Sequence, residues 1–72
     1  MVRVEQRTDV GDGVMVITLD RPERRNAVDH DTLLALLDAQ ARCVDARVVV
    51  LTGAPPAFSA GADLRGVEPG VF

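Results

Sequence analysis

The chain has 72 residues, of which 47% are apolar, and a formal net charge of −3 at pH 7, so it forms at most one small domain with a modest core. Its mildly acidic balance and its two aromatic residues argue against a general nucleic-acid-binding protein, which needs basic surfaces and stacking side chains. The single cysteine, Cys43, excludes an internal disulfide and favours a reduced, cytoplasmic setting.

Two strands joined by a tight turn are predicted at the start of the chain. Residues 2–7 alternate weakly between apolar and polar side chains, as a half-exposed strand does. Residues 9–13 (DVGDG) form a turn cluster that ends in Asp-Gly, a strong hairpin signal. Residues 14–19 (VMVITL) predict a second strand that is buried on both faces in its middle. We expect the two strands to pair antiparallel.

A polar loop with concentrated positive charge follows over residues 20–26 (DRPERRN). Its proline and its charges predict a loop or a short turn. Three arginines, Arg21, Arg24 and Arg25, lie within five residues. Such a run is most often a solvated loop, but arginine also binds phosphate through two N–H groups at once. The sequence leaves both interpretations open.

The clearest helix runs from Asp29 to Cys43. Asp29 suits the N-cap, and Asp31 complements the positive end of the helix dipole. His30 is expected to be exposed and is given no role, while Cys43 is expected to pack without acting as a nucleophile. The helix is amphipathic: its apolar arc holds Leu33, Leu37, Gln40, Ala41 and Val44, flanked by Leu34 and Leu36, and its charged arc holds Asp31, Asp38 and Arg42.

The most informative stretch begins with residues 48–53 (VVVLTG), whose near-continuous apolar character predicts a buried interior strand ending at a glycine. This run is too short to span a membrane. Residues 54–57 (APPA) form a stiff connector, and residues 58–64 (FSAGADL) a tight turn of small residues that opens a helix. Residues 65–72 lack helical periodicity and are expected to form a loop.

The small residues of this turn leave backbone N–H groups uncovered. Gly61 permits backbone angles that other residues resist. A helix starting near Asp63 leaves its first N–H groups without internal partners and carries a partial positive charge there. Strand, turn and helix N-terminus together predict a seat for an oxyanion or a phosphate. The alternative is that the small residues only let strand and helix pack closely.

Two stretches of the sequence resemble the crotonase superfamily, the enoyl-CoA hydratase/isomerase group. They are residues 19–28 (LDRPERRNAV) and residues 51–53 with 57–64 (LTG, then AFSAGADL), in family order and at about the family's separation. The resemblance implies an α/β fold, the N-terminal part of a crotonase-like ββα spiral with the order strand, strand, helix, strand and the start of a helix. Residues 1–72 are then an N-terminal fragment of a crotonase-like domain, the rest of which is absent from this chain.

The resemblance also implies a substrate and its contacts. Crotonases bind acyl-CoA thioesters and stabilise an enolate-like oxyanion with two backbone N–H groups. By resemblance, Ala60 supplies one of these N–H groups and Asp63 caps the following helix. The thioester is the substrate, and neither a cofactor nor a metal is implied. The residues implied to border coenzyme A are Arg24, Arg25, Ala27, Ala60, Gly61, Ala62, Asp63 and Leu64.

Several parts of the family's machinery are not found in this sequence. The second N–H donor and the catalytic glutamates of the family lie further downstream, and Glu5, Glu23 and Glu68 occupy no matching motif. Residues 54–56 stand where the family often has glycines and a basic residue. The resemblance implies three partners: acyl-CoA, the remaining C-terminal part of the same protein, and further copies in a homotrimer or hexamer. Neither nucleic acid nor a membrane is expected as a partner.

Three functions remain open from the sequence. The first is enoyl-CoA hydratase/isomerase-type chemistry in the complete protein. The second is acyl-CoA binding by a crotonase fold without catalysis, which needs the same residues here and differs in the missing glutamates. The third is a serine hydrolase using Ser59, although Ala57 replaces the first glycine of a nucleophile elbow and two prolines separate the turn from its strand.

Overall fold

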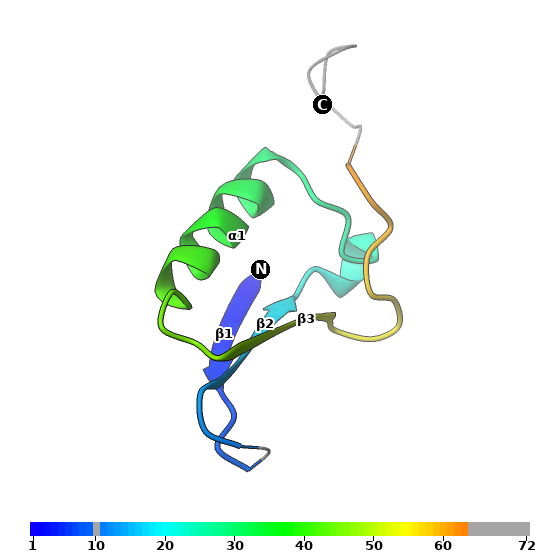
Figure 1. Ribbon diagram of the computed structural model, residues 1–72. Helices are drawn as coiled ribbons and strands as arrows, with labels where there is room; N and C mark the ends of the chain where they lie inside the picture. Colours follow the sequence, from blue (N-terminus) through cyan, green and yellow to red (C-terminus); the bar gives the residue numbers. More distant parts are fainter. Residues whose placement is uncertain (10, 64–72) are drawn as a thin grey trace.

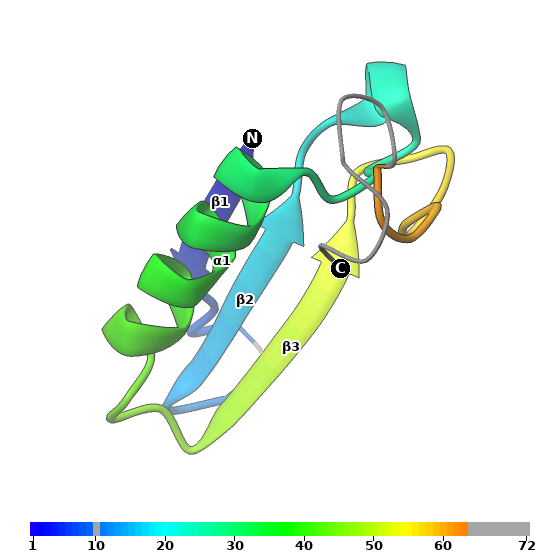
Figure 2. The same ribbon diagram turned by 90° about the horizontal axis from the view of Figure 1, so that it is seen from above.

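The architecture was derived from a computed structural model, which describes residues 1–9 and 11–63. Three strands form one sheet in the order β1-β2-β3, and a helix lies on one of its faces (Figures 1 and 2). The predicted α/β class and the order strand, strand, helix, strand are confirmed. The predicted start of a second helix and the loop 65–72 lie outside the described residues. The elements are β1 (Val2–Gln6), β2 (Val14–Leu19), the 3-10 helix η1 (Pro22–Arg24), α1 (His30–Arg42) and β3 (Val48–Gly53).

The sheet is mixed, and β2 is its central strand in the described chain. β1 pairs antiparallel with β2, with Val4 opposite Ile17, as the hairpin signal predicts. β3 pairs parallel with β2, with Leu51 opposite Ile17. Parallel neighbours need a crossover connection, and α1 supplies it. Because β2 and β3 run in the same direction, the loops that follow them leave the same edge of the sheet.

The core lies between α1 and the sheet. Ile17 of β2 is buried against Ala39 and Cys43, and Leu36 packs beside them. Thr32 is buried as well, so the packed stripe of α1 follows the three- and four-residue spacing of one helix face. The small side chains of Ala39 and Cys43 let the helix approach the sheet closely. Cys43 is therefore a packing residue, as predicted.

The arc of α1 that the sequence favoured as its apolar face does not contact the sheet. Leu33, Leu37 and Val44 are 36%, 54% and 81% exposed. The apolar arc of α1 extends from the packed stripe well around the helix, so it is wider than a single helix–sheet contact requires. The helix and its bounds were predicted correctly, but the predicted apolar arc is not the one that packs on the sheet. A second apolar surface therefore remains on α1.

β3 forms where it was predicted, but it is not buried within the described chain. Its apolar residues from Val48 to Leu51 are 43–51% exposed. Successive side chains of a strand point to opposite faces, so both faces of β3 are open. The reason is its position: β3 is the edge strand, and α1 lies over β1 and β2 (Figure 2). The three residues that end β2, from Ile17 to Leu19, are buried instead.

Asp29 caps α1 as predicted. Its side chain accepts hydrogen bonds from the Thr32 hydroxyl at 2.6 Å and from the Thr32 backbone N–H at 2.8 Å. These two bonds favour the ionised carboxylate and lower the pKa of Asp29 below its ordinary value. Among the described residues, no helix has the length and apolar composition that crossing a bilayer requires.

The neighbouring leucines Leu36 and Leu37 provide a matched test of the packed arc. Leu36→Ala is expected to lower the free energy of unfolding by about 1–3 kcal/mol, because it removes side-chain atoms packed against the core. Leu37→Ala should change it by less than about 0.5 kcal/mol, because that side chain is exposed. Urea unfolding followed by circular dichroism measures both. Equal effects of the two variants would contradict the packing described.

The Asp29 cap predicts a dependence of stability on pH. Its pKa is lowered in the folded chain, so its contribution is present above the ordinary carboxyl pKa of 3.8 and is lost as the pH falls through the lowered value. Asp29→Asn keeps a capping oxygen and removes the titration. The urea midpoint should therefore fall less for the variant than for the parent between about pH 5 and pH 2. If the urea midpoints of the parent and the variant fall equally with pH, the Asp29 cap contributes no pH dependence to stability.

Candidate functional site

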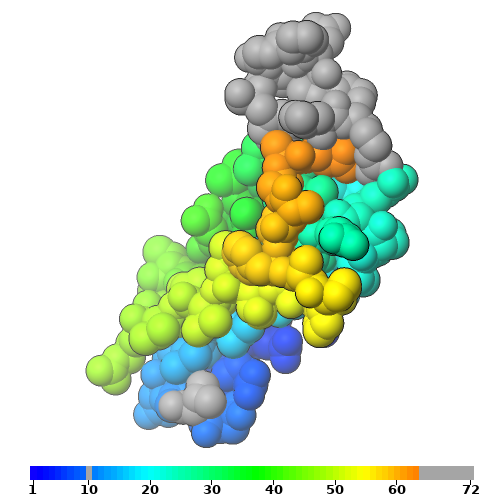
Figure 3. All heavy atoms as spheres, turned by 90° about the vertical axis from the view of Figure 1, so that its right-hand side faces the viewer, coloured from blue at the N-terminus to red at the C-terminus, as the bar shows by residue number. Residues whose placement is uncertain are grey.

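The two loops that follow the parallel strands meet at one end of the sheet. The first loop comprises residues 20–28 after β2, and the second loop comprises residues 54–63 after β3. In Figure 3 the second loop, yellow to orange, lies against the first loop, in cyan and green. Val28 and Ala62 form an isolated parallel bridge between them. Residues more than 30 positions apart thus become neighbours, as is common at the carboxyl ends of parallel strands.

Three backbone hydrogen bonds join the first loop to the second. The Val28 N–H donates to the Gly61 carbonyl oxygen at 2.8 Å, and the Asp63 N–H donates to the Val28 carbonyl oxygen at 2.8 Å. The Ala60 N–H donates to the Arg25 carbonyl oxygen at 2.9 Å. Gly61 has φ +94°, a region that favours glycine, while, apart from its chain neighbours, no atom of the described residues lies within 4 Å of a Cβ built there. Backbone conformation, and not lack of space, therefore requires glycine at this position.

Asn26 is buried between the two loops, and both the oxygen and the nitrogen of its carboxamide have hydrogen-bond partners. Its Oδ1 accepts from the Arg21 backbone N–H at 2.7 Å. Its Nδ2 donates to the Ala54 carbonyl oxygen at 2.8 Å and to the Ala57 carbonyl oxygen at 2.7 Å. One side chain thus links the beginning of the first loop to both ends of the connector 54–57. Sequence reasoning assigned no role to Asn26, because its partners are distant in the chain.

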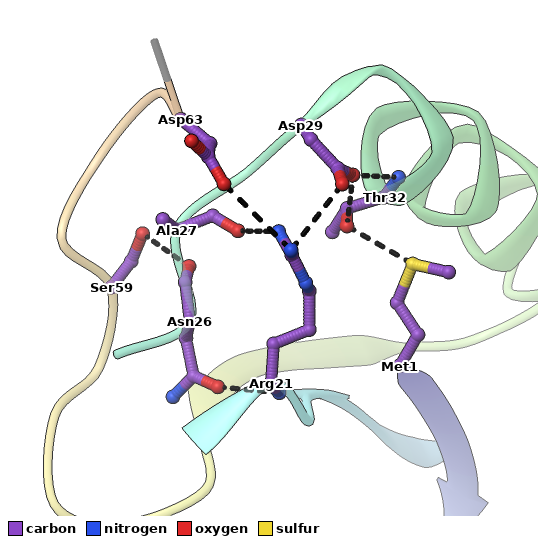
Figure 4. Close-up of polar contacts among 8 residues, drawn as sticks. All are labelled: Met1, Arg21, Asn26, Ala27, Asp29, Thr32, Ser59 and Asp63. Atoms are coloured by element: carbon purple, nitrogen blue, oxygen red, sulfur yellow. Dashed lines mark hydrogen bonds and ion pairs between the residues drawn. The ribbon is translucent and has the colours of Figure 1, made fainter. Parts of the chain in front are cut away.

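Ser59 also links the two loops. Its hydroxyl donates to the Asn26 carbonyl oxygen at 2.9 Å (Figure 4) and accepts from the Gly61 N–H at 3.0 Å. Both bonds are to backbone groups, and neither partner is a base that could activate a nucleophile. The hydroxyl therefore shapes the turn, which argues against the serine hydrolase interpretation.

The Arg21 guanidinium lies among Ala27, Asp29 and Asp63 in a charged cluster (Figure 4). Its guanidinium donates to the Ala27 carbonyl oxygen at 2.5 Å and lies 3.3 Å from the Asp29 carboxylate and 3.7 Å from the Asp63 carboxylate. The side chains of Arg21 and Asp63 are only 14% and 7% exposed. Arg21 is therefore held by carboxylates inside the protein. The predicted capping of a following helix by Asp63 stays a prediction, because that helix lies outside the described residues.

An open pocket of about 340 Å³ lies where the two loops meet. The structure brings five of the predicted site residues to it, from both loops. Arg24 and Arg25 are exposed, so their charges are available to a ligand. Gly61 and Ala62 belong to the same turn but do not line the pocket, and Leu64 lies outside the described residues. The lining residues are Glu23, Arg24, Arg25, Ala27, Ala60 and Asp63.

The charges of the pocket favour an anionic group. The Asp63 carboxylate is paired with Arg21. Glu23 is the other carboxylate that lines the pocket, and within residues 1–9 and 11–63 it forms no ion pair. The three side chains Glu23, Arg24 and Arg25 together carry one net positive charge. The described residues contain no group of three or more His, Cys, Asp or Glu side chains arranged to hold a metal ion. Glu23 lies within the first motif, residues 19–28, but was not among the predicted site residues.

The family of the chain follows from comparison with known proteins. The model of the enoyl-CoA hydratase/isomerase family matches residues 9–70. The chain therefore belongs to the enoyl-CoA hydratase/isomerase family, and the resemblance of its two motifs to crotonases is confirmed. The β-β-α-β arrangement matches crotonase-fold structures over this part of their length.

Three similar proteins show how much of the family's length is present. The probable enoyl-CoA hydratase echA6 of Mycobacterium leprae is 46% identical over 61 residues, which cover 76% of this chain and 25% of that protein. The hydroxycinnamoyl-CoA hydratase-lyase of Pseudomonas fluorescens is 36% identical over 62 residues, which cover 82% of this chain and 22% of that protein. The crystal structure of enoyl-CoA hydratase from Thermoplasma volcanium matches with a TM-score of 0.77 and 39% identity. The match covers 89% of this chain and 25% of the chain in that structure. The chain thus spans about a quarter of the length of these relatives.

The charged cluster predicts a difference between two arginines. Arg21→Met should lower the free energy of unfolding by about 2–4 kcal/mol, because the buried Asp63 carboxylate loses a cation. Arg3→Met removes the exposed pair of Arg3 with Asp20 and should change stability by less than about 0.5 kcal/mol. Thermal or urea unfolding of both variants measures the difference. A loss for Arg21→Met no larger than that for Arg3→Met would contradict the cluster.

Proposed function

We propose that this chain forms the part of an acyl-CoA site that holds coenzyme A and supplies one backbone donor to the thioester oxygen. The observation that carries the proposal is the pocket itself, because it unites residues that the family's two motifs place in separate loops. The family membership of the chain supports the choice of an acyl-CoA thioester as the ligand.

The exposed arginines support binding of the phosphate groups of coenzyme A. Arg24 and Arg25 line the pocket, and neither has an ion pair among the contacts found in the described part of the chain. A guanidinium binds phosphate through two parallel N–H donors. Arg21 is different, because its guanidinium is committed to Ala27, Asp29 and Asp63. We therefore assign phosphate contacts to Arg24 and Arg25 alone.

The Ala60 backbone N–H is the candidate oxyanion donor. Ala60 is an exposed residue that lines the pocket, and its side chain is only a methyl group, so a thioester can approach it. In the structure this N–H donates to the Arg25 carbonyl oxygen. A thioester oxygen must therefore take the place of that carbonyl. In other enzymes such a donor stabilises the transition state by about 3–4 kcal/mol.

The complete protein is proposed to carry out enoyl-CoA hydratase/isomerase-type chemistry through a thioester enolate. This part of the chain does not define the reaction, because relatives that share it are called both enoyl-CoA hydratase and hydroxycinnamoyl-CoA hydratase-lyase. Glu23 lies at the pocket but in no motif that matches a catalytic glutamate of the family. The second oxyanion donor and the general acid and base are assigned to the part of the family's length that this chain does not cover.

The remaining C-terminal part of the protein is the proposed partner of the exposed apolar surface. Within the described part of the chain, the second apolar arc of α1 and both faces of β3 are open, and β3 has β2 as its one strand neighbour, so its other edge offers backbone groups for pairing. Apolar surface of this kind marks a binding interface. We further propose that the complete protein is a cytoplasmic homotrimer or hexamer, as the family resemblance implies.

Binding of coenzyme A tests the proposal with two variants of equal charge. Arg24→Gln/Arg25→Gln should weaken the binding of CoA by the full chain about tenfold, because two phosphate contacts are lost. Arg7→Gln/Arg42→Gln removes the same charge from the far ends of β1 and α1 and should weaken it less than about twofold. Equilibrium dialysis measures both dissociation constants. Absence of binding by the parent chain, or equal loss in both variants, would refute the proposed site.

A further inference from the structure

We infer that Asn26 is the positioning residue of the proposed acyl-CoA site: its carboxamide sets the distance between the two loops whose residues form the pocket. The inference rests on the proposed function for the identity of the ligand. Asn26 itself does not line the pocket, so it acts through the groups it holds.

The backbone conformation of Asn26 contributes to this positioning. Arg25 and Asn26 have φ values of 51° and 57°, so two successive residues other than glycine lie in the left-handed region. Asparagine tolerates this region better than most residues. The conformation directs the Arg25 carbonyl to the Ala60 N–H and the Asn26 carbonyl to the Ser59 hydroxyl. Both contacts hold the turn that carries the candidate oxyanion donor.

The side chain of Asn26 also contributes, because it supplies N–H donors to the connector of the second loop, whose two prolines have none. Pro55 and Pro56 have no backbone N–H, so the middle of the connector 54–57 cannot be fixed by its own amide groups. The two N–H groups of the Asn26 carboxamide instead bind the carbonyl oxygens at the two ends of this connector. A Cβ built at Gly53 would clash with the Phe58 carbonyl oxygen and lie 2.8 Å from Asn26 Nδ2, so the end of β3 packs closely against both the second loop and this amide.

The hydrogen-bond partners at position 26 require the donors and the acceptor that an asparagine side chain has. The position requires one acceptor for the Arg21 N–H and two donors for the Ala54 and Ala57 carbonyls. A carboxamide supplies one acceptor oxygen and two N–H groups, whereas an ionised carboxylate of the same shape only accepts. Asn26→Asp therefore preserves size and tolerance of the left-handed region but sets a negative charge against two carbonyl oxygens. Asn26→Gly keeps the backbone conformation and removes the carboxamide.

Amide hydrogen exchange and CoA binding by the full chain test the inference together. In Asn26→Asp and in Asn26→Gly, the Ala60 and Asp63 amides should exchange at least about tenfold faster, because their bonds to the first loop open more often. The amides of the β1–β2 pair should keep their rates. The dissociation constant for CoA should rise about tenfold in both variants. Leu36→Ala is the control, since it destabilises the core without touching the loops and should change exchange in the loops and in the sheet alike.

The outcomes separate the inference from the proposed function. Unchanged loop exchange and unchanged CoA binding in both Asn26 variants would overturn the inference. Faster loop exchange in the Asn26 variants of a chain whose parent does not bind CoA would support the positioning role and overturn the proposed ligand. Asn26 is the single asparagine of the sequence, so the side-chain amide signal that disappears in Asn26→Asp is its own. Slow exchange of that signal in the parent is the expected result, and exchange as fast as that of an exposed amide would also overturn the inference.

Discussion

The junction between the two loops is the interaction on which the candidate site depends. β2 and β3 are parallel, so their following loops leave the same edge of the sheet. Proximity alone does not fix two loops relative to each other, because each ordered residue loses conformational entropy. Three backbone hydrogen bonds and the Asn26 carboxamide supply that fixation. Without the junction, the arginines of the first loop and the Ala60 turn would not share a pocket.

Electrostatics divides the three arginines of the first loop into two kinds. Arg21 is largely buried, and two carboxylates and a carbonyl oxygen offset the unfavourable removal of its charge from water. Arg24 and Arg25 remain exposed at the pocket. Three identical residue types close together in sequence therefore have different roles. The first strengthens the frame of the site, and the other two give the pocket its positive charge.

Much of the fold was predictable because its signals are local. Asp29 marked the start of α1, and the Asp-Gly turn and the apolar run 14–19 marked the antiparallel pair. The packed arc of α1 and the burial of β3 were not predictable from periodicity, because both depend on which surfaces meet. The sequence of an apolar strand such as β3 does not show whether other elements of the described chain cover its faces.

The candidate site was predictable to the extent that it follows two motifs. Arg24, Arg25, Ala27, Ala60 and Asp63 were expected near one ligand, and they do line one pocket. The roles of Arg21 and Asn26 could not be predicted, because their partners lie up to 42 positions away in sequence, as the Arg21–Asp63 pair shows. A buried asparagine in a loop has a recognisable function only when the carbonyl groups it binds are known.

The central proposal is that the first and second loops together form the acyl-CoA site. The most direct measurement is the set of backbone amide chemical shifts of the full ¹⁵N-labelled chain during titration with butyryl-CoA. We expect the shifts to change in residues 23–28 and 60–63, and Ala60 to be among them, because its N–H exchanges the Arg25 carbonyl for the thioester oxygen. Changes confined to the β1–β2 hairpin or to the exposed face of β3 would contradict it.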